Sequence, residues 1–277
     1  MSWFRRRPLT PLPDEQLGEA CTEDAVIAEA RTLPRFPTVV ADVLQGRALL
    51  SRYALQVELE TDPALADELK TAWRVGPLER LLSIMPPEIV FERLVEVACV
   101  RYADALAPPL QREARNRRRR HAVAVAGASR ALARDAGADP MIAQAAFLTG
   151  AVHLVGVHAL ELYVRNHWPQ AAERLARGDL GIEACAESVG CCPWRVGGAL
   201  LKDRDLPDAV WRAVAGQGLR AGGASTVRLR QARRCAHLAG FSPVTGDAPT
   251  QPAPAVGIAG AVEAVRHVDR LRDARMV

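Results

Sequence analysis

The 277-residue chain is predicted to be an all-α protein, because its composition and its helix-start signals both favour helices. Aromatic residues make up only 5% of it, while alanine, leucine, valine and arginine are abundant, a balance that disfavours strands. Aspartate followed by proline, a pair that caps and starts helices, occurs at Asp62-Pro63 and at Asp139-Pro140. No segment alternates polar and apolar residues as a strand would. We therefore expect a compact, single-domain bundle of short helices.

Each expected helix shows apolar residues at helical spacing, usually behind a proline or an acidic cap. In order along the chain the pattern predicts helices near 38–44, 62–73, 78–84, 87–100, 121–132, 140–152, 171–176, 182–189, 196–201, 207–214, 226–238 and 262–272. Residues 1–30 contain several prolines without a sustained period and are expected to form a flexible arm. The helical domain is expected over 31–240, followed over 241–277 by a linker and a basic helix.

Composition and charge exclude several classes of protein. The formal net charge of +4 is small for this length, so composition alone does not require a nucleic-acid partner. The N-terminus carries arginines where a secretory signal needs an apolar run, which leads us to expect a cytoplasmic protein. The longest apolar stretch, 143–164, contains Gln144, His153, His158 and Glu161, so we interpret it as buried core rather than a membrane span. Six scattered cysteines predict no disulfide framework.

Four segments, in this order, resemble the HDOD family, the non-hydrolytic relatives of the HD and HD-GYP metal phosphohydrolases. They are Leu-Pro-Arg-Phe-Pro at 33–37, Asp-Pro-Ala-Leu-Ala at 62–66, the stretch from Phe147 to Gly156, and Val-Gly-Gly-Ala-Leu-Leu at 196–201 followed by Leu206-Pro207. The resemblance covers about 33–215. It implies an HD-like helical bundle and a non-catalytic signal-transduction or regulatory role in a bacterial cytoplasm.

The resemblance also identifies a missing ligand. Where the HD pattern has His-Asp, this chain has His153-Leu154, and leucine supplies no metal donor. Trp73-Arg74 replaces the Asn-Ser that often ends the family's Asp-Pro helix, and Pro193-Trp194 stands where histidine is frequent, so the chain resembles a divergent member. We expect no catalytic residues, no bound metal and no cofactor.

Three histidines remain candidates for a small-ligand pocket, namely His121, His153 and His158. His121 shares a helical face with Val125 and other apolar residues, and it matches the position of an upstream ligand in HD hydrolases. Histidines on such faces usually make local hydrogen bonds within a core. The alternative is a residual mononuclear metal site, and with it a metal-dependent phosphohydrolase.

The densest run of positive charge is a candidate for binding an anion or a partner, through Arg115, Arg117, Arg118, Arg119 and Arg120. Basic residues at a helix N-terminus oppose the helix dipole, which favours an acidic or anionic neighbour there. The simpler interpretation is a solvated helix start. No aromatic residue interleaves the run, so binding of single-stranded nucleic acid by stacking is not indicated. The leading hypothesis is a scaffold that binds a signalling or regulatory protein partner, with a nucleic-acid-associated regulator as the alternative and no membrane association.

Overall fold

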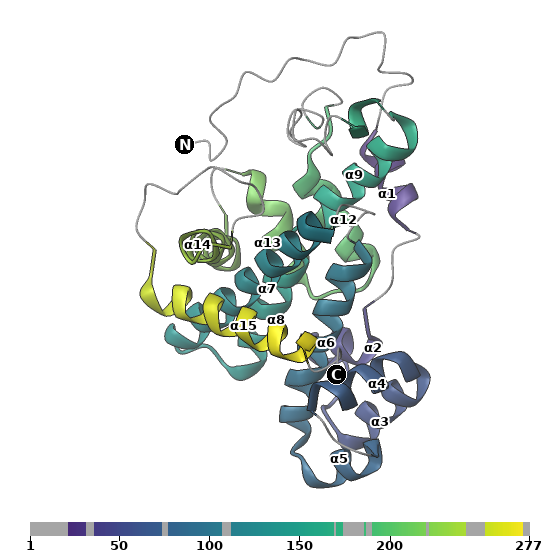
Figure 1. Ribbon diagram of the computed structural model, residues 1–277, viewed down its shortest axis with the longest axis vertical. Helices are drawn as coiled ribbons and strands as arrows, with labels where there is room; N and C mark the ends of the chain where they lie inside the picture. The colour runs from purple at the N-terminus through teal and green to yellow at the C-terminus, as the bar shows by residue number, and fades with distance from the viewer. Residues whose placement is uncertain are drawn as a thin grey trace.

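The computed structural model describes residues 22–31, 36–73, 77–106, 112–168, 170–173, 186, 190–219, 222–241 and 253–273. Helices and the turns between them account for all regular structure in these ranges, so the predicted all-α fold class is confirmed. The helices assemble into one bundle around a continuous apolar core (Figure 1). Expected helices at 171–176 and 182–189 fall largely outside the described residues.

In the part of the chain that the structure describes, the first half contributes six helices to the bundle. Its helices are α1 (Glu23–Ala30), α2 (Thr38–Leu44), α3 (Arg52–Thr61), α4 (Pro63–Trp73), α5 (Leu78–Ile84) and α6 (Pro87–Leu106). Helices α3, α4 and α5 gather at one end of the molecule, whereas α1 lies near the other, against α9 and α12 (Figure 1). Asp62 caps α4, because its carboxylate accepts from the backbone N–H of Leu65 at 3.0 Å.

Two helices, α7 (Arg112–Asp135) and α8 (Pro140–Val152), form the centre of the bundle. Asp139 caps α8 by accepting from the N–H of Met141 at 2.7 Å, as the Asp-Pro signal predicts. The later helices surround this pair. They are α9 (Val155–His167), α12 (Pro193–Asp203), α13 (Asp208–Ala215), the short 3-10 turn η2 (Gly216–Gly218), α14 (Ala224–Leu238) and α15 (Ala255–Asp273).

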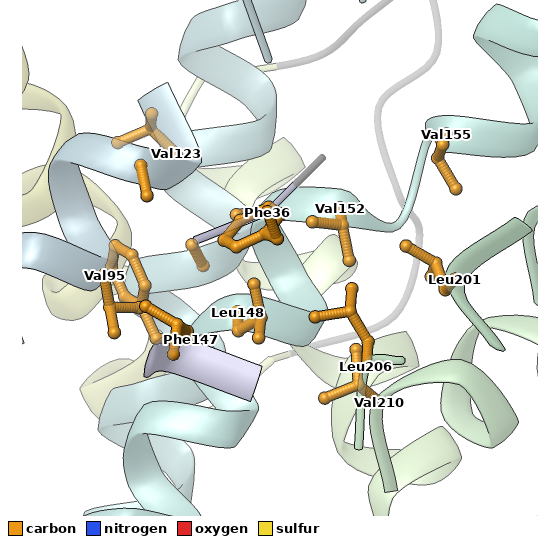
Figure 2. Packing of buried hydrophobic residues seen from close by; sticks show 14 of the residues in the cluster. Phe36, Val95, Val123, Phe147, Leu148, Val152, Val155, Leu201, Leu206 and Val210 are labelled. Carbon is orange, nitrogen blue, oxygen red and sulfur yellow. The ribbon is translucent and has the colours of Figure 1, made fainter. Parts of the chain in front are cut away.

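The core joins residues that are far apart in sequence. Figure 2 shows Phe36 and Val95 near Phe147 and Leu148 of α8, while Leu206 and its neighbours pack further along. Burying large side chains such as these supplies about 1.5–3 kcal/mol each. One helical stretch, 140–167, is long and apolar enough to cross a membrane by length and composition, but 72% of its most apolar window is buried inside the bundle.

Two helices differ from the sequence-based expectation at the chain ends. Helix α1 lies within the stretch 1–30 for which an arm is expected. It forms because Thr22 caps it, and it docks because Glu23 accepts hydrogen bonds from the N–H of Cys192 at 3.1 Å and from Arg195 at 2.9 Å. Helix α15 begins seven residues before the expected start at 262.

Helix α15 packs along α7 at very short range. A Cβ on Gly127 of α7 would lie 2.3 Å from the carbonyl oxygen of Gly260, and one on Gly260 would lie 2.5 Å from the Cβ of Ala131. Only the absence of side chains allows the two backbones to approach this closely. Arg120 of α7 adds an ion pair with Asp269 of α15. The C-terminal helix therefore belongs to the packed bundle.

Candidate functional site

The His153-Leu154 pair lies in the turn between α8 and α9. His153 is fully buried at the C-terminal end of α8, and Leu154 is 8% exposed. Their neighbours Val152 and Val155 point into the apolar core in Figure 2. The position where the resemblance expects a carboxylate therefore holds a buried apolar side chain.

Close backbone contacts fix this turn. A Cβ on Gly156, at the start of α9, would lie 1.8 Å from the carbonyl oxygen of Pro193 and 2.5 Å from the backbone nitrogen of Gly197 on α12. A Cβ on Gly150 of α8 would lie 2.6 Å from the backbone of Ala126 on α7. The glycines of two separate sequence motifs, Gly156 and Gly197, thus meet at one contact between helices.

His121 of α7 and His153 face each other inside the bundle, with ring centroids 5.3 Å apart and ring planes tilted by 59°. The Nδ1 of His121 lies 2.6 Å from the carbonyl oxygen of Phe241, and that of His153 lies 2.6 Å from the carbonyl oxygen of Gly150. A carbonyl only accepts, so each Nδ1 carries the hydrogen that it donates. Each Nε2 is consequently a bare acceptor, and neither has a hydrogen-bond partner among the described residues.

Burial keeps both imidazoles neutral. Loss of hydration, with smaller contributions from the nearby charges of Arg233 and His237, lowers the pKa of His121 to about 3 despite the bond to Phe241. For His153, burial again acts most strongly, and the neighbouring His121 and Arg233 add to it, so its pKa falls well below the usual value. The pair therefore presents two lone pairs and no charge.

A separate polar cluster lies on α9. Glu161 is buried and forms an ion pair with Arg118 of α7, while the Nδ1 of His158 lies 3.6 Å from the same carboxylate oxygen. Burial by itself raises the pKa of Glu161, but the neighbouring His158 and the positive charge of Arg118 outweigh it, so the pKa of the carboxyl is lowered. Glu161 is therefore an ionised carboxylate that ties α9 to α7.

These residues are not arranged to bind the metal ion that the resemblance to HD hydrolases implies. Within the described residues, no group of three or more histidine, cysteine, aspartate or glutamate side chains is arranged to hold a metal ion. The buried carboxylate beside His158, that of Glu161, is engaged by Arg118, and Leu154 adds no donor. Catalytic metal centres need at least three protein ligands and an open position, so no metal-assisted step follows from this geometry.

The comparisons with known proteins agree with the helical architecture and with the later two of the four motifs. A family model described as the HDOD domain matches residues 97–218, which include the histidine pair and the contact between Gly156 and Gly197. Over these residues the chain is similar to the HDOD domain. A search of curated proteins finds no match.

Three solved structures share the fold of this chain at low sequence identity. A candidate phosphohydrolase from Shewanella amazonensis SB2B is 17% identical, with a TM-score of 0.59 over 89% of this chain and 97% of its own. An HDOD domain protein of unknown function from Geobacter sulfurreducens is 16% identical, with a TM-score of 0.60 over 89% of both chains. A candidate signal transduction protein from Marinobacter aquaeolei VT8 is 16% identical, with a TM-score of 0.55 over 92% of this chain and 60% of its own.

The arginine run lies along the first turns of α7. Arg118 turns inward to Glu161, and Arg120 reaches Asp269 of α15, so these two guanidinium groups hold the bundle together. Arg117 and Arg119 are partly buried on the same helix. The side chain of Arg115 lies outside the described part of the chain. A role for this run in binding an anion or partner stays a prediction, as does a ligand pocket at the three histidines.

Sequence reasoning did not identify the partners of the site residues. Glu161 follows His158 by three positions, which places the two on one helical face, and that spacing could have indicated their contact. The carbonyl of Phe241 and the charge of Arg233 come from α14 and the turn after it, more than a hundred residues from His121. Only the tertiary fold brings them to the pair.

Proposed function

We propose that this HDOD protein is a non-catalytic signal-transduction regulator of the cytoplasm, whose helical body binds a protein partner. Leu154 carries the proposal, because a buried leucine, which supplies no metal donor, follows His153 where the resemblance leads us to expect a carboxylate. The remaining pair of neutral imidazoles can shape a core but cannot gather the ligands that activate water. The name of the Marinobacter relative, a candidate signal transduction protein, is consistent with this role.

A hydrolysis assay tests the non-catalytic half of the proposal. The full chain is incubated with Mn²⁺ and with bis(p-nitrophenyl) phosphate, nucleotides or cyclic dinucleotides, beside a His153→Ala variant whose fold is checked by circular dichroism. We expect the two proteins to release product at the same background rate. Hydrolysis that depends on Mn²⁺ and disappears in the folded variant would instead make this a phosphohydrolase.

Affinity capture tests the regulatory half. The full chain is used to capture proteins from lysate of the source organism, with and without nuclease treatment, and bound proteins are identified by mass spectrometry. We expect a signalling protein that is retained after nuclease treatment and that binds the purified chain directly. Capture that is lost with nuclease would point to a nucleic-acid-associated regulator, and Arg117→Ala/Arg119→Ala would then be compared with the wild type at low and moderate salt.

A further inference from the structure

Helix α1 packs on α9 and α12, apart from α3, α4 and α5 (Figure 1). Its two fully buried side chains are those of Val26 and Ala30. Because these positions are about one helical turn apart, the two side chains form a single narrow apolar stripe along α1. Ala28, on the other side of the helix, is exposed. The N-terminal helix is therefore amphipathic, and α9 and α12 receive its apolar side.

Glu23 fastens the start of α1. Its carboxylate lies 2.7 Å from a guanidinium nitrogen of Arg195 and accepts from the backbone N–H of Cys192, the N-cap of α12. The first N–H groups of a helix favour a negative charge, and the side chain of Cys192 makes no capping hydrogen bond. A carboxylate from another helix thus supplies the cap that α12 lacks.

Polar contacts also fasten the end of α1. The Nε2 of His167 on α9 lies 2.8 Å from the carboxylate of Glu29, and Arg204 donates to the last backbone carbonyl of α1 at 2.9 Å. Arg31 and Asp203 lie 4.0 Å apart and are largely exposed, so this pair contributes little. The receiving surface is therefore mainly basic, and α1 presents acids to it. We call this surface the α1 seat and define it by His167, Cys192, Arg195 and Arg204.

The attachment of α1 is weaker than that of the central helices. Isolated helices shorter than about 12 residues are marginal in water, and α1 has eight residues, so it depends on the seat to stay helical. Its fully buried side chains are both small. The side chains of Glu23 and Arg195 are 28% and 66% exposed, and ion pairs open to solvent contribute little. Release of α1 alone therefore costs much less free energy than unfolding of the bundle.

We propose that the α1 seat is a docking site for a short, acidic, amphipathic helix of a protein partner, which displaces α1. This inference rests on the proposed function, since it names the surface through which the regulator binds its partner. The partner helix would place one carboxylate at Arg195 and a second at His167. An apolar side chain between the two would take the position of Val26. A basic helix would face Arg195 and Arg204 and would be repelled.

A titration with the α1 peptide tests the seat in the full chain. Val26→Asp places a charge in the buried stripe and is expected to release α1. The matched control is Ala28→Asp, which adds the same charge to the exposed side of the same helix. A peptide of residues 22–31, blocked at both ends, is added to ¹⁵N-labelled protein, and binding is followed by the chemical shifts of α9 and α12. The peptide should bind Val26→Asp at least about tenfold more tightly than the wild type or Ala28→Asp, because only the first has a vacant seat.

Reversed charges test the preference for an acidic helix. A peptide that carries Glu23→Lys and Glu29→Lys should bind Val26→Asp at least about tenfold more weakly than the native peptide. Adding Arg195→Glu to the protein should weaken the native peptide and strengthen the lysine peptide. If circular dichroism shows that Val26→Asp is unfolded, Glu23→Lys/Glu29→Lys in the full chain takes its place, because it removes only polar contacts of α1. Equal binding of the two peptides would overturn the assignment to an acidic helix.

Two results would overturn the seat itself. They are the absence of native-peptide binding to a folded chain with α1 released, and equal binding of the native peptide to that chain and to the wild type. A partner captured from lysate should bind Val26→Asp more tightly than the wild type and should be displaced by the α1 peptide. A captured partner that binds both chains equally would support the regulatory function and remove the seat. Peptide binding to Val26→Asp without any captured protein would support the seat and contradict the regulatory function.

Discussion

Lowering the pH from 8 to 5 is expected to destabilise this protein mainly through the buried pair of His121 and His153. In the unfolded chain an imidazole has a pKa near 6.5, so at pH 5 it is almost fully protonated. In the folded chain His121, with a pKa of about 3, is still neutral at that pH. The unfolded state therefore binds protons that the folded state does not bind, and the free energy of unfolding falls as the pH falls below 6.5.

The linkage between proton uptake and unfolding sets the size of this loss. For a shift from 6.5 to about 3, His121 contributes a loss of about 2 kcal/mol between pH 8 and pH 5. Burial also lowers the pKa of His153 well below the usual value, so the proton that it takes up on unfolding adds to this loss. Glu161 has a lowered pKa and stabilises the fold above its usual carboxyl range, so its contribution is lost only in more acidic solution.

Urea unfolding followed by far-UV circular dichroism at pH 8, 7, 6 and 5 measures this dependence. The wild type is expected to lose more than about 2 kcal/mol over the range, and His153→Gln less than the wild type, because one titrating group is gone. His167→Gln, which removes a histidine that is 49% exposed, is the control for losing an imidazole outside the core. Equal losses in the wild type and in His153→Gln would refute the assignment of a buried, neutral pair.

Three further substitutions test the packing around the site. Gly156→Ala places a Cβ 1.8 Å from a backbone oxygen of α12 and should lower the free energy of unfolding in urea by about 3 kcal/mol or more. Gly223→Ala, with open space around it, is the control and should change that free energy by less than about 1 kcal/mol. Similar effects of the two substitutions would contradict the close contact. Glu161→Ala should lower the free energy of unfolding by about 3 kcal/mol, because it leaves Arg118 without its buried partner. In a protein that already carries Arg118→Ala, the same substitution should cost much less. Losses that simply add would argue against the ion pair. Leu154→Asp should lower the melting temperature at pH 7, because it places a carboxylate where a leucine is buried. Elemental analysis of this variant should find no bound Mn²⁺. One equivalent of bound metal would show that the pocket retains its other ligands.

The sequence predicts helices well where their signals are local. Helix α5 has the predicted bounds, Leu78 to Ile84, and α8 starts at the predicted Asp-Pro pair, because caps and prolines act within one turn. Helix α3 was not predicted. It starts at Ser51 without a proline, and its exposed Tyr53 and Val57 blur the apolar stripe that periodicity depends on.

The candidate site could be predicted only in part, for a similar reason. Helical spacing placed His121 on an inner face, and the structure puts it opposite His153. The contacts that orient the rings are not all local in the sequence. The acceptor for His121 is the carbonyl of Phe241, 120 residues away. The clash that forbids a side chain at Gly156 likewise depends on how α9 crosses α12. Such contacts leave no periodic signal in the sequence.

The packing of α14 and α15 on α7 shows that the recognised domain and the folding unit differ in extent. The family match ends at residue 218, yet Phe241, just past α14, holds His121, and α15 buries its Ala261 and Val265 beside α7. A fragment that ends at residue 218 would leave His121 without the carbonyl that accepts its hydrogen bond. It would also expose to water the face of α7 that α15 covers. Recombinant work on this protein should therefore retain the chain through residue 273.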